Sequence, residues 1–310
     1  MKLIRIALTC ILAIATTSAA FARSSSSSAP DPRLGAWREI GGTRALLLEE
    51  NRAGWFDGAQ PRFFRATFND AGATLESWGR HTTFNLRLKD GQLHVVTPDA
   101  ELMMQRLEQT PEVLLVTPYP LPEHIELNDS MVSFLQGDLR QRRIEDQRVR
   151  LNIGPGTDMS EMQTVDADNT EFLRNIIAEA GWIDVERFGV EASDAAFLIV
   201  QHTGDIRLMR TALPLIEADV LAKRLDGQNY ALLFDRLQLR LGYLQRYGSQ
   251  LTTIDDASLL MPCEDIERVD QFRAEMGMTL LGKYLEFFQD DGTPSVRHLG
   301  EGQYEAEVGR

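Results

Sequence analysis

The chain has 310 residues, with 46 acidic against 32 basic side chains and a net charge of −14 at pH 7. Such a surface repels nucleic acid phosphates and anionic lipid headgroups, so neither nucleic acid nor bare membrane is expected as a partner. The sequence has two cysteines, Cys10 and Cys263, too few for a disulfide framework or a cysteine zinc site.

The first 22 residues have the pattern of a secretion signal. Lys2 and Arg5 precede an apolar stretch over 6–15, and small residues end at Ala22; signal peptidase recognises this order. A membrane anchor would need about 20 apolar residues, and polar residues 16–18 close the stretch too early. We expect cleavage after Ala22 and no membrane insertion afterwards. The secreted or periplasmic product has 30 basic against 46 acidic residues, a net charge of −16.

Residues 23–33 form a Ser-rich leader with little to bury, which is typical of a disordered segment. Residues 34–122 then contain short apolar runs separated by turn signals. Within one run, Phe84, Leu86 and Leu88 alternate with polar residues, the period of a strand buried on one face. The runs cover 45–48, 63–68, 83–88, 93–97 and 113–116. The pattern predicts a small antiparallel β-meander or barrel.

The start of this β part has the order Leu34-Gly35-Ala36-Trp37. Together with the meander, this glycine-x-tryptophan pattern resembles the start of lipocalin-like domains. The resemblance implies a ligand inside the barrel, whereas a barrel of this size is more often filled by its own side chains.

Beyond residue 122 the apolar period becomes helical. Asn128 and Asp129 can cap a first helix that runs to about residue 151. Pro214 is expected to kink one of the later helices. Those helices are expected over 168–180, 193–204, 205–225, 228–247, 265–276 and 279–288. The fold class is therefore α+β with two domains: a β domain over 34–122 and an all-α domain over 123–290, followed by a tail over 291–310.

A series of polar motifs runs through the predicted helices. They are Asp146-Gln147-Arg148-Val149-Arg150, Gly181-Trp182, GVEASDAA at 189–196, Val200-Gln201-His202, Asp235-Arg236 and Gln245-Arg246-Tyr247-Gly248-Ser249-Gln250. In this order they resemble a bacterial family catalogued only as a domain of unknown function, over about 128–288. That family has proline where Ile183 stands, and Ala-Asp after Gln-His, where this chain has Thr203-Gly204-Asp205. The resemblance implies a fold and a set of candidate residues, without an activity.

The motif residues are candidates for one polar cluster, provided that the helix faces that carry them converge. His202, Asp235 and Arg236 are the catalytic candidates, with His202 as a general base or acid oriented by a carboxylate. Alternatively the cluster is a hydrogen-bonded network that fixes how the helices dock. The candidate binding residues are Asp146, Gln147, Arg150, Gln201, Gln245, Tyr247 and Gln250.

The sequence contains no H-E-x-x-H, P-loop, Rossmann glycine set or G-x-S-x-G elbow, so neither a metal nor a cofactor is predicted. We therefore expect a non-catalytic binding or interaction module of the cell envelope, whose partner is a small ligand or an envelope protein. The alternative is a hydrolase-like enzyme that uses His202 and Asp235. An open cluster with an available His202 nitrogen would favour the enzyme, and a sealed cluster the module.

Overall fold

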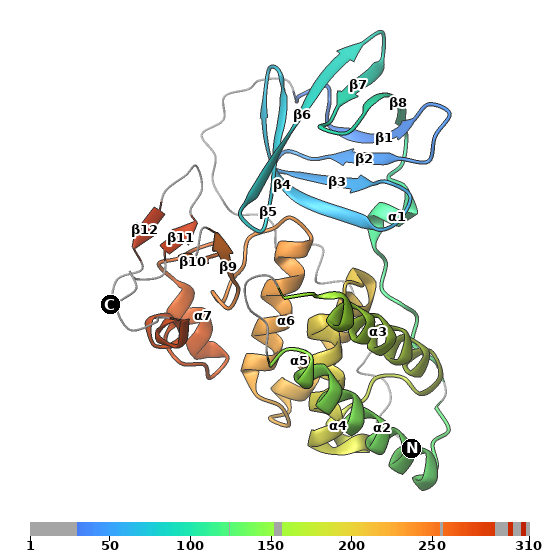
Figure 1. Ribbon diagram of the computed structural model, residues 1–310, viewed down its shortest axis with the longest axis vertical. Coiled ribbons are helices and arrows are strands. Elements are labelled where there is room, and N and C mark those ends of the chain that lie inside the picture. The colour runs from blue at the N-terminus through green and yellow to red at the C-terminus, as the bar shows by residue number, and fades with distance from the viewer. Residues whose placement is uncertain are drawn as a thin grey trace, which may run out of the picture. The chain divides into compact units, whose positions relative to one another are not determined.

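The computed structural model describes residues 30–123, 125–151, 157–254, 257–288, 297–299 and 305–307 (Figure 1). An antiparallel β-barrel is followed by a region of helices, as the sequence predicts. The predicted signal at 1–22 lies outside the described residues, and so do most of the leader and most of the tail.

Eight antiparallel strands close the barrel in sequence order, with the last strand paired back to the first. Trp37 on β1 stands opposite Leu46 on β2, and both are fully buried. Phe84 and Leu86 also point into the core, whereas Leu88, the third member of the predicted alternation, is exposed. The strands are β1 (Gly35–Glu39), β2 (Ala45–Leu48), β3 (Arg52–Phe56), β4 (Pro61–Asn69), β5 (Gly72–Ser77), β6 (Arg80–Lys89), β7 (Gln92–Val96) and β8 (Glu101–Leu107).

The run at 113–116 is not a strand, contrary to the sequence prediction. It forms α1 (Glu112–Leu115), a single helical turn that follows Pro111 and buries Leu114. A short apolar run fits both periods, so the sequence pattern alone does not separate a strand from a single helical turn.

Asp and Asn residues begin most of the long helices. Asn128 accepts the main-chain N–H of Met131 and caps the first of them, as predicted. Asp184, Asp205 and Asp226 cap the three that form the centre of the helical region, each through its carboxylate. The helices are α2 (Asp129–Arg148), α3 (Ser160–Ala180), α4 (Val185–His202), α5 (Ile206–Leu221), α6 (Gly227–Arg240), α7 (Val269–Glu275), α8 (Leu281–Leu285) and the 3₁₀ turn η1 (Glu286–Phe288). None of the helices in the described part of the chain is long and apolar enough to cross a membrane.

Three helix boundaries differ most from those predicted. α3 begins at Ser160 rather than near residue 168, and α4 begins at Val185 with a bend at Gly189, whose φ is 77°. α6 ends at Arg240 rather than at 247, because Gly242 takes a left-handed φ of 80° that ends the helix.

The helical region also carries a small sheet that the sequence analysis did not predict. Its central strand β10 (Ala257–Leu260) pairs with β9 (Leu251–Ile254) in antiparallel and with β11 (Arg297–Leu299) in parallel. β12 (Glu305–Glu307) completes the order β12-β11-β10-β9. The β-branched run Thr252-Thr253-Ile254 favours a strand at this point.

Candidate functional site

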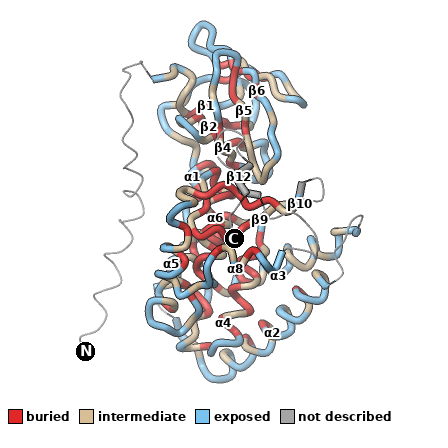
Figure 2. Tube along the Cα trace, turned by 90° about the vertical axis from the view of Figure 1, so that its left-hand side faces the viewer, coloured by how far each residue is buried: buried red, intermediate tan, exposed pale blue. Residues whose placement is uncertain are grey.

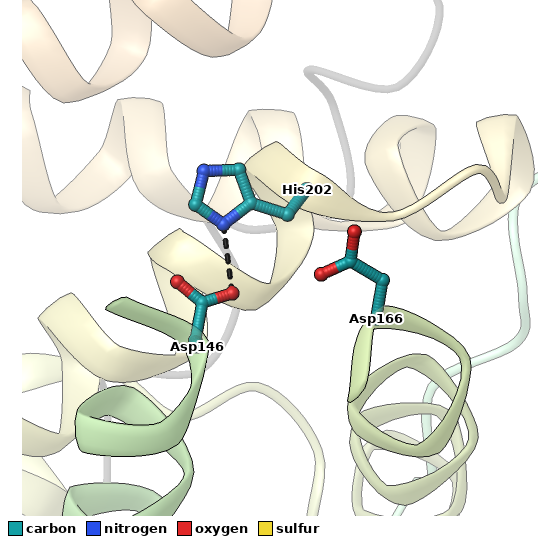
Figure 3. A group of neighbouring side chains, drawn as sticks. All are labelled: Asp146, Asp166 and His202. Atoms are coloured by element: carbon teal, nitrogen blue, oxygen red, sulfur yellow. Dashed lines mark hydrogen bonds and ion pairs between the residues drawn. The ribbon is translucent and has the colours of Figure 1, made fainter. Parts of the chain in front are cut away.

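His202 and Asp146, 56 residues apart in the sequence, form a hydrogen-bonded pair. The His202 Nδ1 atom lies 2.8 Å from Oδ1 of Asp146. Asp146 is fully buried, whereas the His202 side chain keeps 20% of its surface exposed. Figure 3 shows the Nε2 atom on the side of the ring that faces away from the carboxylate. The pair therefore has a buried carboxylate that orients a partly exposed ring.

Asp146 is an exception on a helix that is mostly exposed. Along α2 only Leu135, Leu139 and Asp146 are buried, and Figure 2 shows most of the helix in the colour of exposed residues. Burial alone raises the pKa of the Asp146 carboxyl. The hydrogen bonds from His202 and Gln147 and the charge of Arg150 outweigh burial and lower that pKa. Asp146 is therefore a carboxylate that accepts from His202; in the neutral form of the ring, this contact favours the tautomer with its proton on Nδ1 and its lone pair on Nε2.

Two neighbours in the same motif hold the Asp146 carboxylate in place. Gln147 donates from Nε2 to Oδ2 at 2.8 Å, and Arg150 lies 3.0 Å from Oδ1. Arg150 also donates to the main-chain oxygen of Asp146 at 2.8 Å and to the carboxylate of Asp166 on α3. One guanidinium thus joins the carboxylates of two helices.

The end of α4 is tied to α3 just beyond His202. The Thr170 hydroxyl on α3 and the hydroxyl of Thr203 lie 2.9 Å apart, and Thr203 follows directly after the last residue of the helix. The Thr203 hydroxyl also accepts the main-chain N–H of Asp205 at 3.0 Å, the residue that caps α5. These contacts fix the chain on which the His202 ring stands.

Asp235 belongs to a second hydrogen-bond network, which holds the turn that follows α6. It is fully buried on α6, and its two carboxylate oxygens accept the main-chain N–H groups of Arg246, Tyr247 and Ser249 at 2.8 to 3.2 Å. Burial raises the pKa of Asp235 to about 6, against these hydrogen bonds. Its contacts hold the turn that follows α6, whereas His202 takes Asp146 as its carboxylate partner.

The Gln245 side chain also forms hydrogen bonds with this turn. Its side chain accepts the main-chain N–H of Gln250 at 2.9 Å and donates to the main-chain oxygens of Gln250 and Met261. The main-chain oxygen of Tyr247 accepts from the buried Arg273 at 2.7 Å. The backbone of the turn, together with Met261 and Arg273, therefore satisfies these buried polar groups.

Arg236 connects the two networks. Its Nε donates to Oε1 of Gln250 at 3.1 Å, and its Nη1 donates to the main-chain oxygen of Gln201 at 2.7 Å. Gln201 precedes His202, so the turn after α6 is joined to the end of α4 through one guanidinium.

The predicted candidates therefore fall into two groups. Asp146, Gln147, Arg150 and His202 make one group around the ring, while Asp235, Gln245, Tyr247 and Gln250 make the other around the turn. The sequence analysis missed Asp166 because it placed the start of α3 beyond that residue. The signal that could have found it is the polar residue one turn before Thr170 on a helix that begins at Ser160.

Asp146, Asp166 and His202 also form a potential metal ligand set, with one ligand atom of each within 4.8 Å of the others (Figure 3). Two carboxylates and an imidazole suit several divalent transition metals. However, Arg150 contacts both carboxylates and supplies a positive charge between them. This arrangement fits an oriented histidine better than a metal ligand set.

A comparison with family models matches residues 130–296 to a family of unknown function, DUF6624. The matched segment is just over half of the chain and contains both networks. Neither the curated proteins nor the solved structures include a match to this chain. By this match, the chain belongs to the DUF6624 family, for which no function is known.

Proposed function

We propose that the helical region is a hydrolase-like enzyme in which His202 is the general base and Asp146 orients it. The observation that carries this proposal is the 2.8 Å contact between His202 Nδ1 and a fully buried carboxylate, on a ring that remains partly exposed. A buried carboxylate behind the imidazole and a lone pair in front of it are what a general base requires. The carboxylate partner is thus Asp146 and not Asp235.

The reaction would be the hydrolysis of an ester. His202 Nε2 takes a proton from a water molecule while the water oxygen bonds to the electrophilic carbon or phosphorus. As the bond to the leaving oxygen breaks, the imidazolium returns that proton to it, so an acid and an alcohol are released. Asp146 stabilises the imidazolium between the two steps, and Arg150 and Gln147 keep the carboxylate in place.

The first test needs no substrate. Nitrogen NMR of the imidazole, at a pH where the ring is neutral, should show the proton of His202 on Nδ1. Asp146→Asn should remove this preference, because an amide no longer offers a carboxylate at that position. A proton on Nε2 in the wild-type protein would contradict the proposed base.

The second test measures turnover on chromogenic carboxylic and phosphoric esters. His202→Ala should abolish the hydrolysis, and added imidazole should restore part of it, because it can take the place of the lost ring. The matched control is His94→Ala on β7, where the histidine pairs with Glu101; this variant should keep full activity. Equal turnover by wild type and His202→Ala would exclude the role.

A non-catalytic binding module of the cell envelope is the second candidate. It is favoured by the bridge that Arg150 makes between Asp146 and Asp166, which a docking network also explains. The resemblance of the barrel start to lipocalin-like domains supports a ligand for the β part, but Trp37, Leu46, Leu75, Leu93 and Met104 are all fully buried in its core. A module predicts no rescue by imidazole, so the second test separates the two candidates.

The signal pattern at 1–22 supports export, so the reaction would occur in the periplasm or outside the cell. Intact-mass measurement of the exported protein should give a chain that begins at Arg23. A mass that retains Met1 to Ala22 would contradict export by this route.

A further inference from the structure

Two arginines on α6, Arg236 and Arg240, have no acidic partner in the described parts of the chain. Arg236 bonds to Gln250 Oε1 and to a main-chain oxygen, both uncharged acceptors. Nε of Arg240 is buried and has no hydrogen-bond partner among the residues that the structure describes. The nearby charges that act on Arg236 include those of Arg240 and Arg150, and no described acidic residue is among them. Because a largely buried cation without a counter-charge lowers stability, the arrangement calls for another source of negative charge.

α4 packs against α6 so that, along the helix axis, Arg236 lies just before the position of His202 and Arg240 lies beyond it. Asp194 on α4 is hydrogen-bonded to Asn229 on α6, and Gln201 is hydrogen-bonded to Arg236. In each pair the two residues are 35 positions apart in the sequence. The two helices therefore run in the same direction in a constant register. By this offset His202 is level with residue 237, so Arg236 lies one residue before that level. Arg240 lies three residues beyond it, about 4.5 Å along the axis.

The same region holds neighbouring positive charges and one more buried donor without an acceptor. Burial lowers the pKa of Arg236 to about 10, and the nearby charges of Arg240 and Arg150 act in the same direction. Gln201 is 4% exposed, and its Nε2 amide likewise has no hydrogen-bond partner in the described part of the chain. Positive charges and unused N–H groups thus gather next to the proposed base, in the pattern of a site for an oxygen-rich anion.

We propose that Arg236 and Arg240 bind the anionic group of the substrate, a phosphoryl or carboxylate group, beside His202. This inference rests on the proposed role of His202 as the base and names the class of ester that it would hydrolyse. An anion at this place would restore the missing counter-charge and would bring the electrophilic atom of a phosphoester, or of an ester carrying a carboxylate, close to Nε2. Arg236 stays anchored to Gln201 and Gln250, so Arg240 has the unused capacity to bind.

The test measures the thermal midpoint of the full-length protein in inorganic phosphate, in acetate and in chloride at equal ionic strength. Phosphate or acetate should raise the midpoint above that in chloride, since a ligand of the native state stabilises it by mass action. A response to phosphate alone indicates a phosphoryl group, and a response to acetate alone indicates a carboxylate. Equal midpoints in all three salts would overturn the proposal.

The variant Arg240→Gln should weaken binding of the effective anion about tenfold or more, as the loss of a charged hydrogen bond implies. Arg143→Gln, the same change at an exposed arginine on α2, is the matched control and should respond like wild type. An unchanged response in Arg240→Gln, or an equal loss in Arg143→Gln, would refute the site. If Arg240→Gln does not fold, Arg240→Lys takes its place; it should fold and bind more weakly than wild type, and wild-type binding would refute the site.

His202→Ala separates this inference from the proposed function. The variant should still bind the anion, because both arginines are intact. Anion binding in a protein whose His202 has no role in turnover would leave the anion site standing and remove the proposed base. Turnover that depends on His202, in a protein that shows no anion response, would leave the proposed base standing and remove the anion site.

Discussion

Replacing Asp235 by alanine should destabilise the helical region strongly. The change removes the acceptor of the main-chain N–H groups of Arg246, Tyr247 and Ser249 and leaves them without a partner. A buried donor without an acceptor costs about 1 to 3 kcal/mol. Since the N–H of Arg246 is only partly buried and can bond water, we expect a total loss of about 3 to 6 kcal/mol. Such a loss is a large part of the stability of most domains.

The assay is urea unfolding followed by helical circular dichroism, with the free energy of unfolding taken from the midpoint and slope. Asp194→Ala on α4 is the control, because that carboxylate makes one long contact of 3.4 Å, to Asn229; it should cost no more than about 1 kcal/mol. Asp235→Asn keeps one oxygen acceptor and should fall between the two. If Asp235→Ala and Asp194→Ala have the same stability, Asp235 does not hold the turn.

Three further predictions follow from burial and from the chain order. Burial raises the pKa of Asp235 to about 6, so the native state binds this proton more tightly than the unfolded state. The stability of wild type relative to Asp235→Asn should therefore fall by about 2 kcal/mol as pH rises from about 4 to about 6. A rise over that interval in urea titrations would contradict the assignment. Burial also raises the pKa of the Cys263 thiol, so a thiol reagent at pH 8 should label the native protein far more slowly than the unfolded one. A chain of residues 128–310 should melt cooperatively with helical circular dichroism, and a gradual melt would show that the helical region needs the barrel.

Local patterns in the sequence were sufficient for the fold class. The alternation around Phe84 and Leu86 predicts a strand, and the period of the apolar side chains beyond residue 122 predicts helices, because each pattern reports which side of one element is buried. The cap at Asn128 was also readable, since it depends on residues three positions apart. The run at 113–116 was misread because four apolar residues fit a strand and a helical turn equally well.

Only the tertiary structure decided which polar residues meet. The sequence analysis named Asp235 with His202 as catalytic candidates and Asp146 as a candidate binding residue, because both carboxylates stand in polar motifs on helices and no local pattern shows which one meets His202. The direction in which α2 and α6 present these carboxylates depends on how the helices dock, and that depends on contacts across the whole core. In the structure Asp146 is hydrogen-bonded to His202, and Asp235 accepts hydrogen bonds from the turn after α6. It alone also shows that Nε of Arg240 finds no hydrogen-bond partner among the described residues, since a missing partner is a property of the packed chain and not of any local pattern.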